Sequence, residues 1–340
     1  AEAGAGTDAI KLAFLYKPAR VSLAGPSLID ADPVHNRPPL GQTFAAANGE
    51  RFAVIVNHFK SKSCGDATGA EADQGDLQGC WNALRVRQAQ ALADFAEALQ
   101  VAGDTEDVLV IGDLNAYAQE DPVHELTQRG WVDEVGRYNR FGYGYVFDGA
   151  AGRLDHALAS PSLSPKVTGA TEWHINADEP SVIDYNLEFK PQDLYSPTPY
   201  RSSDHDPVVV GLQLYRTIQG NRRPEKVQGT PGDDILIGGK GPDRIWGGTG
   251  ADVFVYRSAL DGPDVIHDFE LAHDRLDLRA LFPAAGADPF ASGQARLHPT
   301  GAGAILKVRR GASPHGAWLP LVLLKGVAAR DFDPRRHLVR

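Results

Sequence analysis

The stretch that decides the fold is residues 108–117, with the sequence VLVIGDLNAY. Its branched apolar residues, 108–111, predict a strand buried on both faces, and Gly112 is expected to mark its end. Asp113 and Asn115 follow two positions apart, so on an extended chain their side chains point to one side. They supply a carboxylate and an amide that can donate to a phosphate oxygen without adding charge. A simple Asp-x-Asn turn at a strand end would have the same sequence.

Other apolar runs carry the same kinds of polar residue at or beside one end. They are FAVIVNHF (52–59) with Asn57 and His58, RLDHAL (153–158) with Asp155, and SSDHDPVVV (202–210) with Asp204, His205 and Asp206. In an open α/β sheet, functional residues gather where strands end.

The motifs NHFKSK, GDLN, RLDH and SSDHDPV, in this order, resemble the C-terminal part of the endonuclease/exonuclease/phosphatase superfamily. The sequence around Cys64 and Cys80 resembles, more narrowly, the secreted bacterial extracellular nucleases of that superfamily. The resemblance runs over about residues 8–214 and implies a DNase I-like α/β sandwich. The family's N-terminal part supplies an Asn and a metal-binding Glu, and nothing before Ile10 corresponds to them. We therefore expect the N-terminal portion of this domain to be missing.

The resemblance also implies roles for single residues. His205 would act on the phosphoryl group or the attacking water, held by Asp155, and Asp113 would polarise that water. Asn115 and His58 would hold phosphate oxygens, although His58 could also be a general acid or a structural histidine at a strand end. Asp204 would be a metal ligand. Carboxylate and amide oxygens favour Mg²⁺ or Mn²⁺, which would stabilise charge on the phosphate and the leaving oxygen.

Composition limits the possible classes of protein. The 340 residues carry a formal net charge of -10, which disfavours a tight DNA-binding module but is compatible with a metal-dependent phosphodiesterase. No apolar run approaches the ~20 residues of a membrane helix, so no membrane span is expected. No signal peptide is visible, and there is no methionine, which predicts a processed chain or a fragment.

Cys64 and Cys80 are the only cysteines and lie sixteen positions apart in a polar loop. This arrangement predicts a disulfide and an oxidising compartment. Two free thiols or a two-cysteine metal site are the alternatives. A helix is predicted over residues 81–102, with Gly103 ending it. Arg85 and Arg87 in its first turns are interpreted as a solvated face, with phosphate contact as the alternative.

The remaining pattern predicts shorter elements. Strands are expected at 10–16 and 166–175, and a hairpin over 143–158 that turns at 148–149. A short helix should begin with Asp121 as N-cap and Pro122 next, and Gly130 should end it. His156 is interpreted as structural and Asp206 as a turn residue.

Residues 229–255 are three consecutive nonapeptides, GTPGDDILI, GGKGPDRIW and GGTGADVFV. They match the calcium-binding repeat G-G-x-G-x-D-x-U-x, in which glycines permit tight turns. Asp234, Asp243 and Asp252 recur nine apart and are expected to stack on one side, bridging Ca²⁺ between turns. A flexible linker is the alternative. The segment resembles RTX proteins of Gram-negative bacteria, which type I secretion machinery exports and which fold in extracellular calcium.

The expected domains are a partial catalytic domain (1–215), a linker (216–228), the β-roll repeats (229–256) and a small C-terminal β domain with a secretion signal (257–340). The sequence thus predicts a secreted, monomeric, metal-dependent phosphodiesterase that hydrolyses nucleic acid, most simply extracellular DNA. A nucleotide, sugar-phosphate or phospholipid phosphoesterase on the same scaffold is one alternative. An inactive calcium-binding fragment is the other.

Overall fold

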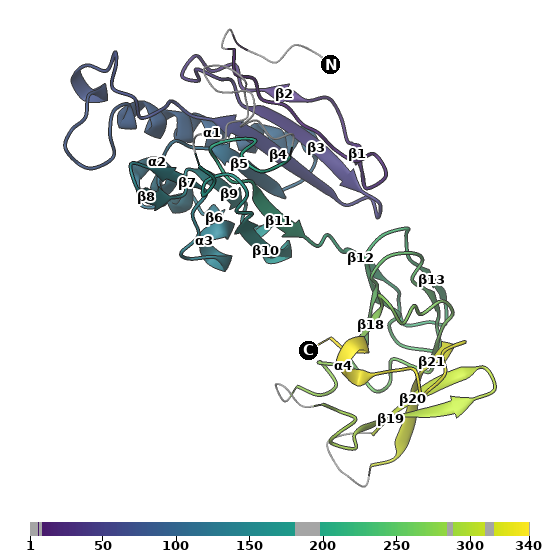
Figure 1. Ribbon diagram of the computed structural model, residues 1–340. Helices are drawn as coiled ribbons and strands as arrows, with labels where there is room; N and C mark the ends of the chain where they lie inside the picture. Colours follow the sequence, from purple (N-terminus) through teal and green to yellow (C-terminus); the bar gives the residue numbers. More distant parts are fainter. Residues whose placement is uncertain (1–5, 7–8, 181–197, 284–287, 310–315, 340) are drawn as a thin grey trace. The chain divides into compact units, whose positions relative to one another are not determined.

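The computed structural model describes all residues except 1–5, 7–8, 181–197, 284–287, 310–315 and 340. The chain forms two compact units, residues 1–45 with 51–213 and residues 46–50 with 214–340 (Figure 1). Within the described part of the chain, no helix combines the length and apolar character that a membrane crossing needs.

The first unit is built on a seven-stranded sheet. Its main order is β1-β3-β4-β5-β9-β6, and β2 pairs with β3. Strands β7 with β8 and β10 with β11 form two separate antiparallel pairs. The elements of this unit are β1 (Val21–Leu23), β2 (Leu28–Ile29), β3 (Leu40–Ala46), β4 (Arg51–His58), η1 (Gly69–Glu71), α1 (Asn82–Gly103), β5 (Val108–Asp113), α2 (Asp121–Gln128), β6 (Val132–Asp133), α3 (Glu134–Tyr138), β7 (Tyr145–Phe147), β8 (Ala150–Gly152), β9 (Asp155–Ala159), η2 (Ser164–Lys166), β10 (Val167–Glu172) and β11 (Val208–Leu212).

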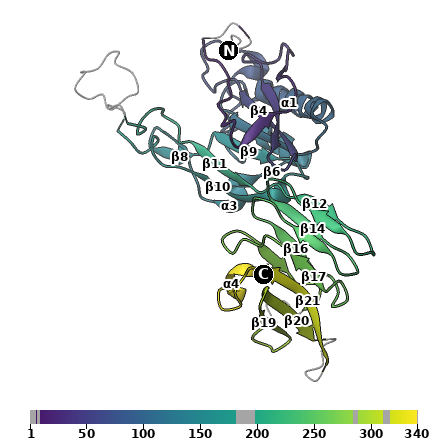
Figure 2. The ribbon, with the colours of Figure 1, turned by 90° about the vertical axis from the view of Figure 1, so that its right-hand side faces the viewer.

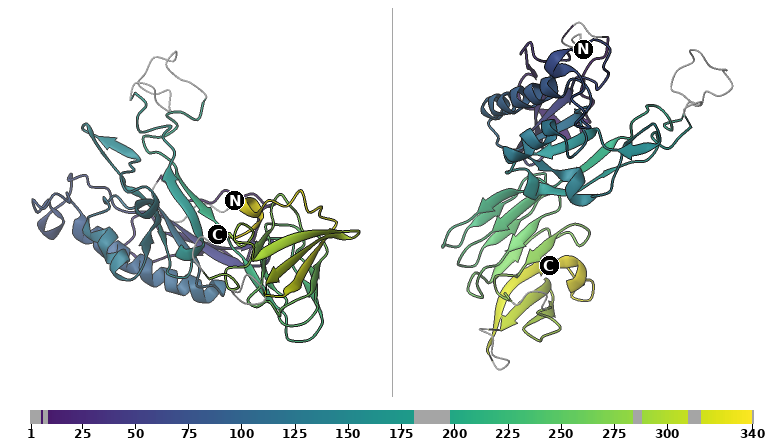
Figure 3. Two further views of the ribbon diagram at one scale, coloured as in Figure 1. Left: turned by 90° about the horizontal axis from the view of Figure 1, so that it is seen from below. Right: turned by 90° about the vertical axis from the view of Figure 1, so that its left-hand side faces the viewer.

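The long helix α1 covers one face of this sheet (Figure 3). Leu92, Phe95 and Leu99 repeat at helical spacing and are buried in one cluster with Ile55 of β4 and Val110 of β5. The apolar run of the opening stretch is therefore a central strand, as its pattern predicted. This packing fixes the ends of β4 and β5 side by side.

Three local predictions need correction. Residues 10–16 form no strand, and Leu15 is fully exposed, because an apolar run becomes a strand only where it finds a pairing edge. The N-cap of α2 is Glu120, so Asp121 is already helical. Strand β5 continues through Gly112 to Asp113, because β4 and β9 both offer pairing partners there.

The second unit contains two stacks of parallel strands (Figure 2). One sheet has the order β12-β14-β16-β18, and the other has β13-β15-β17-β21-β20-β19, whose last two pairings are antiparallel. Its elements are β12 (Arg216–Gln219), β13 (Lys226–Gln228), β14 (Asp234–Ile237), β15 (Arg244–Trp246), β16 (Val253–Val255), β17 (Asp264–Ile266), β18 (Arg275–Asp277), β19 (Ala295–Thr300), β20 (Gly303–Arg309), β21 (Trp318–Lys325) and α4 (Pro334–His337).

The roll corrects two predictions. The segment 216–228, expected as a linker, supplies β12 and β13, which pair with β14 and β15. The three repeat aspartates do not share one side. Asp234 begins β14 and Asp252 directly precedes the adjacent strand β16 of the same sheet, whereas Asp243 directly precedes β15 of the other sheet. Each nonapeptide is one strand and one turn, so a full turn of the roll takes two of them.

Candidate active site

Three of the candidate residues lie side by side across three strands. The parallel β4–β5 register pairs His58 with Asp113, and the antiparallel β5–β9 register pairs Asp113 with Asp155. Gly112 permits this close approach. Its φ is +130°, and a Cβ there would lie 2.0 Å from the carbonyl oxygen of Asn57. The glycine is therefore required by the backbone that delivers Asp113 to the site.

Asn115 holds the Asp113 carboxylate. The Asn115 backbone N–H donates to Asp113 Oδ1 at 2.7 Å, and its side-chain Nδ2 donates to Asp113 Oδ2 at 3.1 Å. The same Nδ2 also donates to the Phe59 carbonyl at 3.1 Å. Both amide hydrogens are thus used within the protein, so this geometry favours a positioning role for Asn115 over the expected direct phosphate contact.

The pKa of the Asp113 carboxyl is raised well above its usual value. Burial first, and then the charge of Asp155, raise the pKa of Asp113 to about 7. The backbone hydrogen bond from Asn115 opposes this increase, because it lowers the pKa of Asp113. His58 Nε2 lies 3.4 Å from Asp113 Oδ2. Asp113 is therefore poised to take up a proton near neutral pH.

His205 completes the row from a segment far along the chain. Its Nδ1 lies 2.5 Å from Asp155 Oδ2. Burial lowers the pKa of His205, but the hydrogen bond and charge of Asp155, with the charges of Asp113 and Asp204, raise it to about 9 overall. The ring of Tyr145 lies over this imidazole, with centroids 4.5 Å apart. At neutral pH His205 is therefore a cation beside two carboxylates.

The two aspartates that flank His205 are placed differently. Asp204 is exposed, and its charge reaches both His205 and Tyr145. Asp206, expected as a turn residue, is instead 2% exposed and anchors the segment 174–177. It accepts hydrogen bonds from three backbone N–H groups of that segment and from His174 Nδ1. Asp206 therefore fixes the backbone on which His205 is carried.

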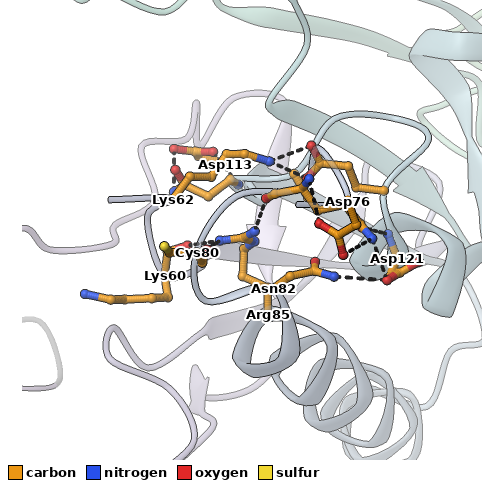
Figure 4. Close-up of polar contacts among 12 residues, drawn as sticks. Lys60, Lys62, Asp76, Cys80, Asn82, Arg85, Asp113 and Asp121 are labelled. Atoms are coloured by element: carbon orange, nitrogen blue, oxygen red, sulfur yellow. Dashed lines mark hydrogen bonds and ion pairs between the residues drawn. The ribbon is translucent and has the colours of Figure 1, made fainter. Parts of the chain in front are cut away.

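The disulfide loop lies beside the row. Cys64 and Cys80 are bonded, with Cα atoms 5.2 Å apart, as the sequence predicted. Arg85 is fully buried beneath the loop, which corrects the expectation of a solvated face (Figure 4). Its guanidinium donates to the carbonyls of Cys80 at 2.7 Å and Gln78 at 2.9 Å, and more weakly to Lys60 at 3.4 Å. Arg87, on the same helix, is exposed and pairs with Glu71.

Sequence patterns did not identify two residues of this site. Tyr145 is visible only as part of an alternating strand, and nothing in the sequence places it on His205. Lys62 follows His58 by four positions and pairs with Glu120 at 2.5 Å. Its Nζ also lies 5.1 Å from the centre of the Tyr117 ring. Both depend on contacts between segments far apart in the chain.

The donor set fits a hard divalent cation in its chemistry. Asp113 and Asp155 are cross-strand neighbours, and burial, followed by the charge of Asp155, raises the pKa of Asp113. Among the described residues, no three His, Cys, Asp or Glu side chains are grouped to hold a metal. Mg²⁺, however, commonly uses one or two carboxylates together with substrate phosphate and water.

The repeat aspartates of the second unit are buried in two ladders. In one, the Asp234 N–H donates to Asp252 Oδ1, and the Asp252 N–H donates to Asp274 Oδ1. In the other, the Asp243 N–H donates to Asp264 Oδ1. Asp234, Asp243 and Asp252 are each at most 1% exposed, and each has a buried oxygen with no hydrogen-bond partner in the structure. Such oxygens fit Ca²⁺, which takes carboxylate and carbonyl ligands.

Comparison with known proteins agrees with this architecture. Residues 3–205, more than half of the chain, match the Endonuclease/Exonuclease/phosphatase family, and residues 228–258 match the RTX calcium-binding nonapeptide repeat. The chain therefore belongs to the endonuclease/exonuclease/phosphatase family and has its DNase I-like α/β fold. Members of this family hydrolyse phosphoester bonds. No curated protein gave a match.

Several solved structures are similar to the chain. An endonuclease/exonuclease/phosphatase family protein from Bacteroides thetaiotaomicron is 14% identical (TM-score 0.35), over 46% of this chain and 57% of its own. The mannosyl-6-phosphatase of the same organism is 15% identical (0.39), over 58% and 69%. D. rerio TDP2 complexed with single-strand DNA product is 16% identical (0.34), over 56% and 68%. The chain thus spans little more than half the length of the first of these proteins.

Proposed function

We propose that this chain is a secreted, metal-dependent phosphodiesterase that hydrolyses nucleic acid. The observation that carries the proposal is the row His58, Asp113, Asp155 and His205, in which Asp113 and His205 have pKa values of about 7 and about 9. A carboxylate that can accept a proton and a cationic imidazole beside it supply a base and an electrostatic donor at the same pH.

The proposed reaction is in-line attack of water on phosphorus. Asp113 takes the proton of the attacking water as the new P–O bond forms. The His205 cation, oriented by Asp155, donates a hydrogen bond to a non-bridging phosphate oxygen, where negative charge grows. His58 holds a second phosphate oxygen. The bond to the leaving oxygen breaks, and that oxygen takes its proton from solvent.

Mg²⁺ or Mn²⁺ would be held by Asp204 together with substrate phosphate and water, and would supply charge stabilisation at the phosphate. Ca²⁺ would be bound in the roll between successive turns by the ladders of Asp234, Asp243 and Asp252. RTX repeats are typical of proteins exported by type I secretion, and the Cys64–Cys80 disulfide fits an oxidising, extracellular location. The proposed protein is a monomer whose partners are nucleic acid and the secretion machinery.

Hydrolysis of linear and circular DNA, with Mg²⁺ varied at constant Ca²⁺, tests this proposal. We expect Mg²⁺-dependent cleavage that His205→Ala reduces by at least 100-fold, while calcium binding stays unchanged. His298→Ala, an exposed histidine on β19, is the matched control and should retain full activity. Hydrolysis of a phosphate monoester without cleavage of DNA would replace the proposal with a phosphatase. Cleavage that survives His205→Ala would show that the catalytic assignment is wrong.

A further inference from the structure

A row of aromatic rings leads outward from His205. Tyr145 and Phe147 are two apart on β7, so their side chains lie on the same face of the hairpin. The Tyr145 ring lies 4.5 Å from the His205 ring, and the Phe147 ring lies 6.3 Å from Tyr145 and is nearly parallel to it, at 15°. The outer end of the row, Phe147, is 64% exposed.

The opposite strand of the hairpin offers little side-chain cover for these rings. The residues directly opposite Tyr145 and Phe147 are Gly152 and Ala150, which have little or no side chain to cover an aromatic ring. A Cβ at Gly152 would lie 2.3 Å from the Tyr117 ring, so Tyr117 packs against this glycine. Phe147 therefore gains little from burial in the fold, whereas Tyr145 is half-buried at the candidate site.

We propose that Tyr145 and Phe147 form a stacking platform for an unpaired nucleobase next to the phosphate at His205. The inference rests on the proposed function and narrows its substrate to single-stranded or locally opened nucleic acid. Flat rings in near-parallel series offer π-faces on which any base can stack, whereas a base inside a duplex is already stacked on its neighbours.

The surrounding charges fit a nucleic-acid strand. The charge of Arg201 acts on Tyr145, where it opposes burial and the charges of Asp204 and Asp113, which together raise the pKa of Tyr145. Lys62 lies over Tyr117 and is paired with Glu120. A strand whose phosphate lies at His205 would therefore pass the Arg201 guanidinium, although the protein as a whole is acidic. The platform is two rings wide, far smaller than a stable protein–protein interface, which takes roughly 800 Å² per partner.

The platform makes a sharp prediction for matched substrates. Cleavage of a single-stranded oligonucleotide is compared with cleavage of the same oligonucleotide carrying abasic sites around the scissile phosphate. Phe147→Ala should lower kcat/KM on the base-bearing strand by roughly 5- to 150-fold, mainly through KM, since a stacked base contributes about 1–3 kcal/mol. On the abasic strand the same substitution should change kcat/KM less than about twofold.

Two further variants separate stacking from folding. Phe147→Trp should restore activity on the base-bearing strand, because it keeps a flat ring at the same position. Phe141→Ala removes an aromatic side chain that is 87% exposed and outside the row, and should leave both substrates unaffected. Equal loss on the base-bearing and abasic strands, or no loss on either, would overturn the platform.

A binding measurement distinguishes failure of the platform from failure of the proposed function. Fluorescence anisotropy with Asp113→Asn, in the presence of Ca²⁺, follows binding of the labelled oligonucleotides without cleavage. If the wild-type chain cuts no nucleic acid, the proposed function fails. Even then, weaker binding of the base-bearing strand after adding Phe147→Ala, with the abasic strand unchanged, would support the platform. Absence of binding by the base-bearing strand would overturn it.

Discussion

At the scale of single residues, the site depends on the pairing of His205 with Asp155. The hydrogen bond and charge of Asp155 are the largest influences that raise the pKa of His205, against the opposing effect of burial. The imidazole is consequently charged at the pH where Asp113 can accept a proton. In the proposed mechanism, this order of pKa values would make Asp113 the base and His205 the donor to phosphate.

We expect Asp155→Asn to lower the pKa of His205 from about 9 toward its usual value near 6.5. Titration of the His205 ring by NMR, without divalent metal, measures this directly. Asp204→Asn is the control, because Asp204 is the weakest of the influences that raise this pKa, and its removal should shift the value much less. An equal shift in both variants would mean that the pKa of His205 is raised by the overall negative charge around it, and not by its hydrogen bond with Asp155.

The sequence predicted which residues would converge better than it predicted what each would touch. His58, Asp113 and Asp155 stand at strand ends, so strand pairing alone brings them together. The contacts of Asn115 and Asp206 depend on Phe59 and on the segment 174–177, and no local pattern reports such partners. Burial of a charged group is decided by the whole fold.

At the scale of elements, the disulfide loop is held by Arg85 as well as by its covalent bond. The guanidinium donates to the carbonyl of Cys80 at one end of the loop and to the carbonyl of Lys60 at the other. Helical periodicity correctly predicted α1, although the helix includes Gly103 and the left-handed residue that caps it is Asp104. Arg85 occupies a buried position that its charge would not suggest. The loop fills that side of the helix, and its structure could not be anticipated from a polar sequence.

Arg85→Met should reduce the free energy of unfolding by about 2–4 kcal/mol, because buried carbonyls of Gln78 and Cys80 lose their donor. Chemical denaturation with the disulfide intact measures the change. The control is Arg87→Met on the same helix, whose exposed ion pair with Glu71 should be worth less than about 1 kcal/mol. A loss below 1 kcal/mol for Arg85→Met would mean that water replaces the guanidinium at no cost.

At the scale of the whole molecule, the second unit contains buried, closely spaced aspartates whose negative charge calcium would neutralise. Burial, followed by the charges of neighbouring aspartates, raises the pKa of Asp252 to about 7, and burial is likewise the main cause that raises Asp264 to about 7 and Asp274 to about 6. The nonapeptide period indicated a calcium-binding roll, but the alternation of its aspartates between two sheets follows only from the three-dimensional turn. The ladders also continue through Asp264 and Asp274, beyond the matched repeats.

These pKa values predict opposite effects of pH with and without calcium. An aspartate whose folded pKa lies above its unfolded value of 3.8 favours the folded state at low pH and loses that contribution as pH rises through about 7. Without calcium, the roll should therefore be more stable at pH 5 than at pH 8. Calcium requires ionised carboxylates, so its stabilising effect should grow over the same range and reverse the order.

Thermal unfolding in EDTA and in millimolar Ca²⁺ measures both trends. Asp252→Asn should weaken both, since it removes one ionisation and one ligand, and the difference between variant and wild type cancels groups that titrate elsewhere. A pH dependence in EDTA that Asp252→Asn leaves unchanged would contradict the assignment of this charge to the roll.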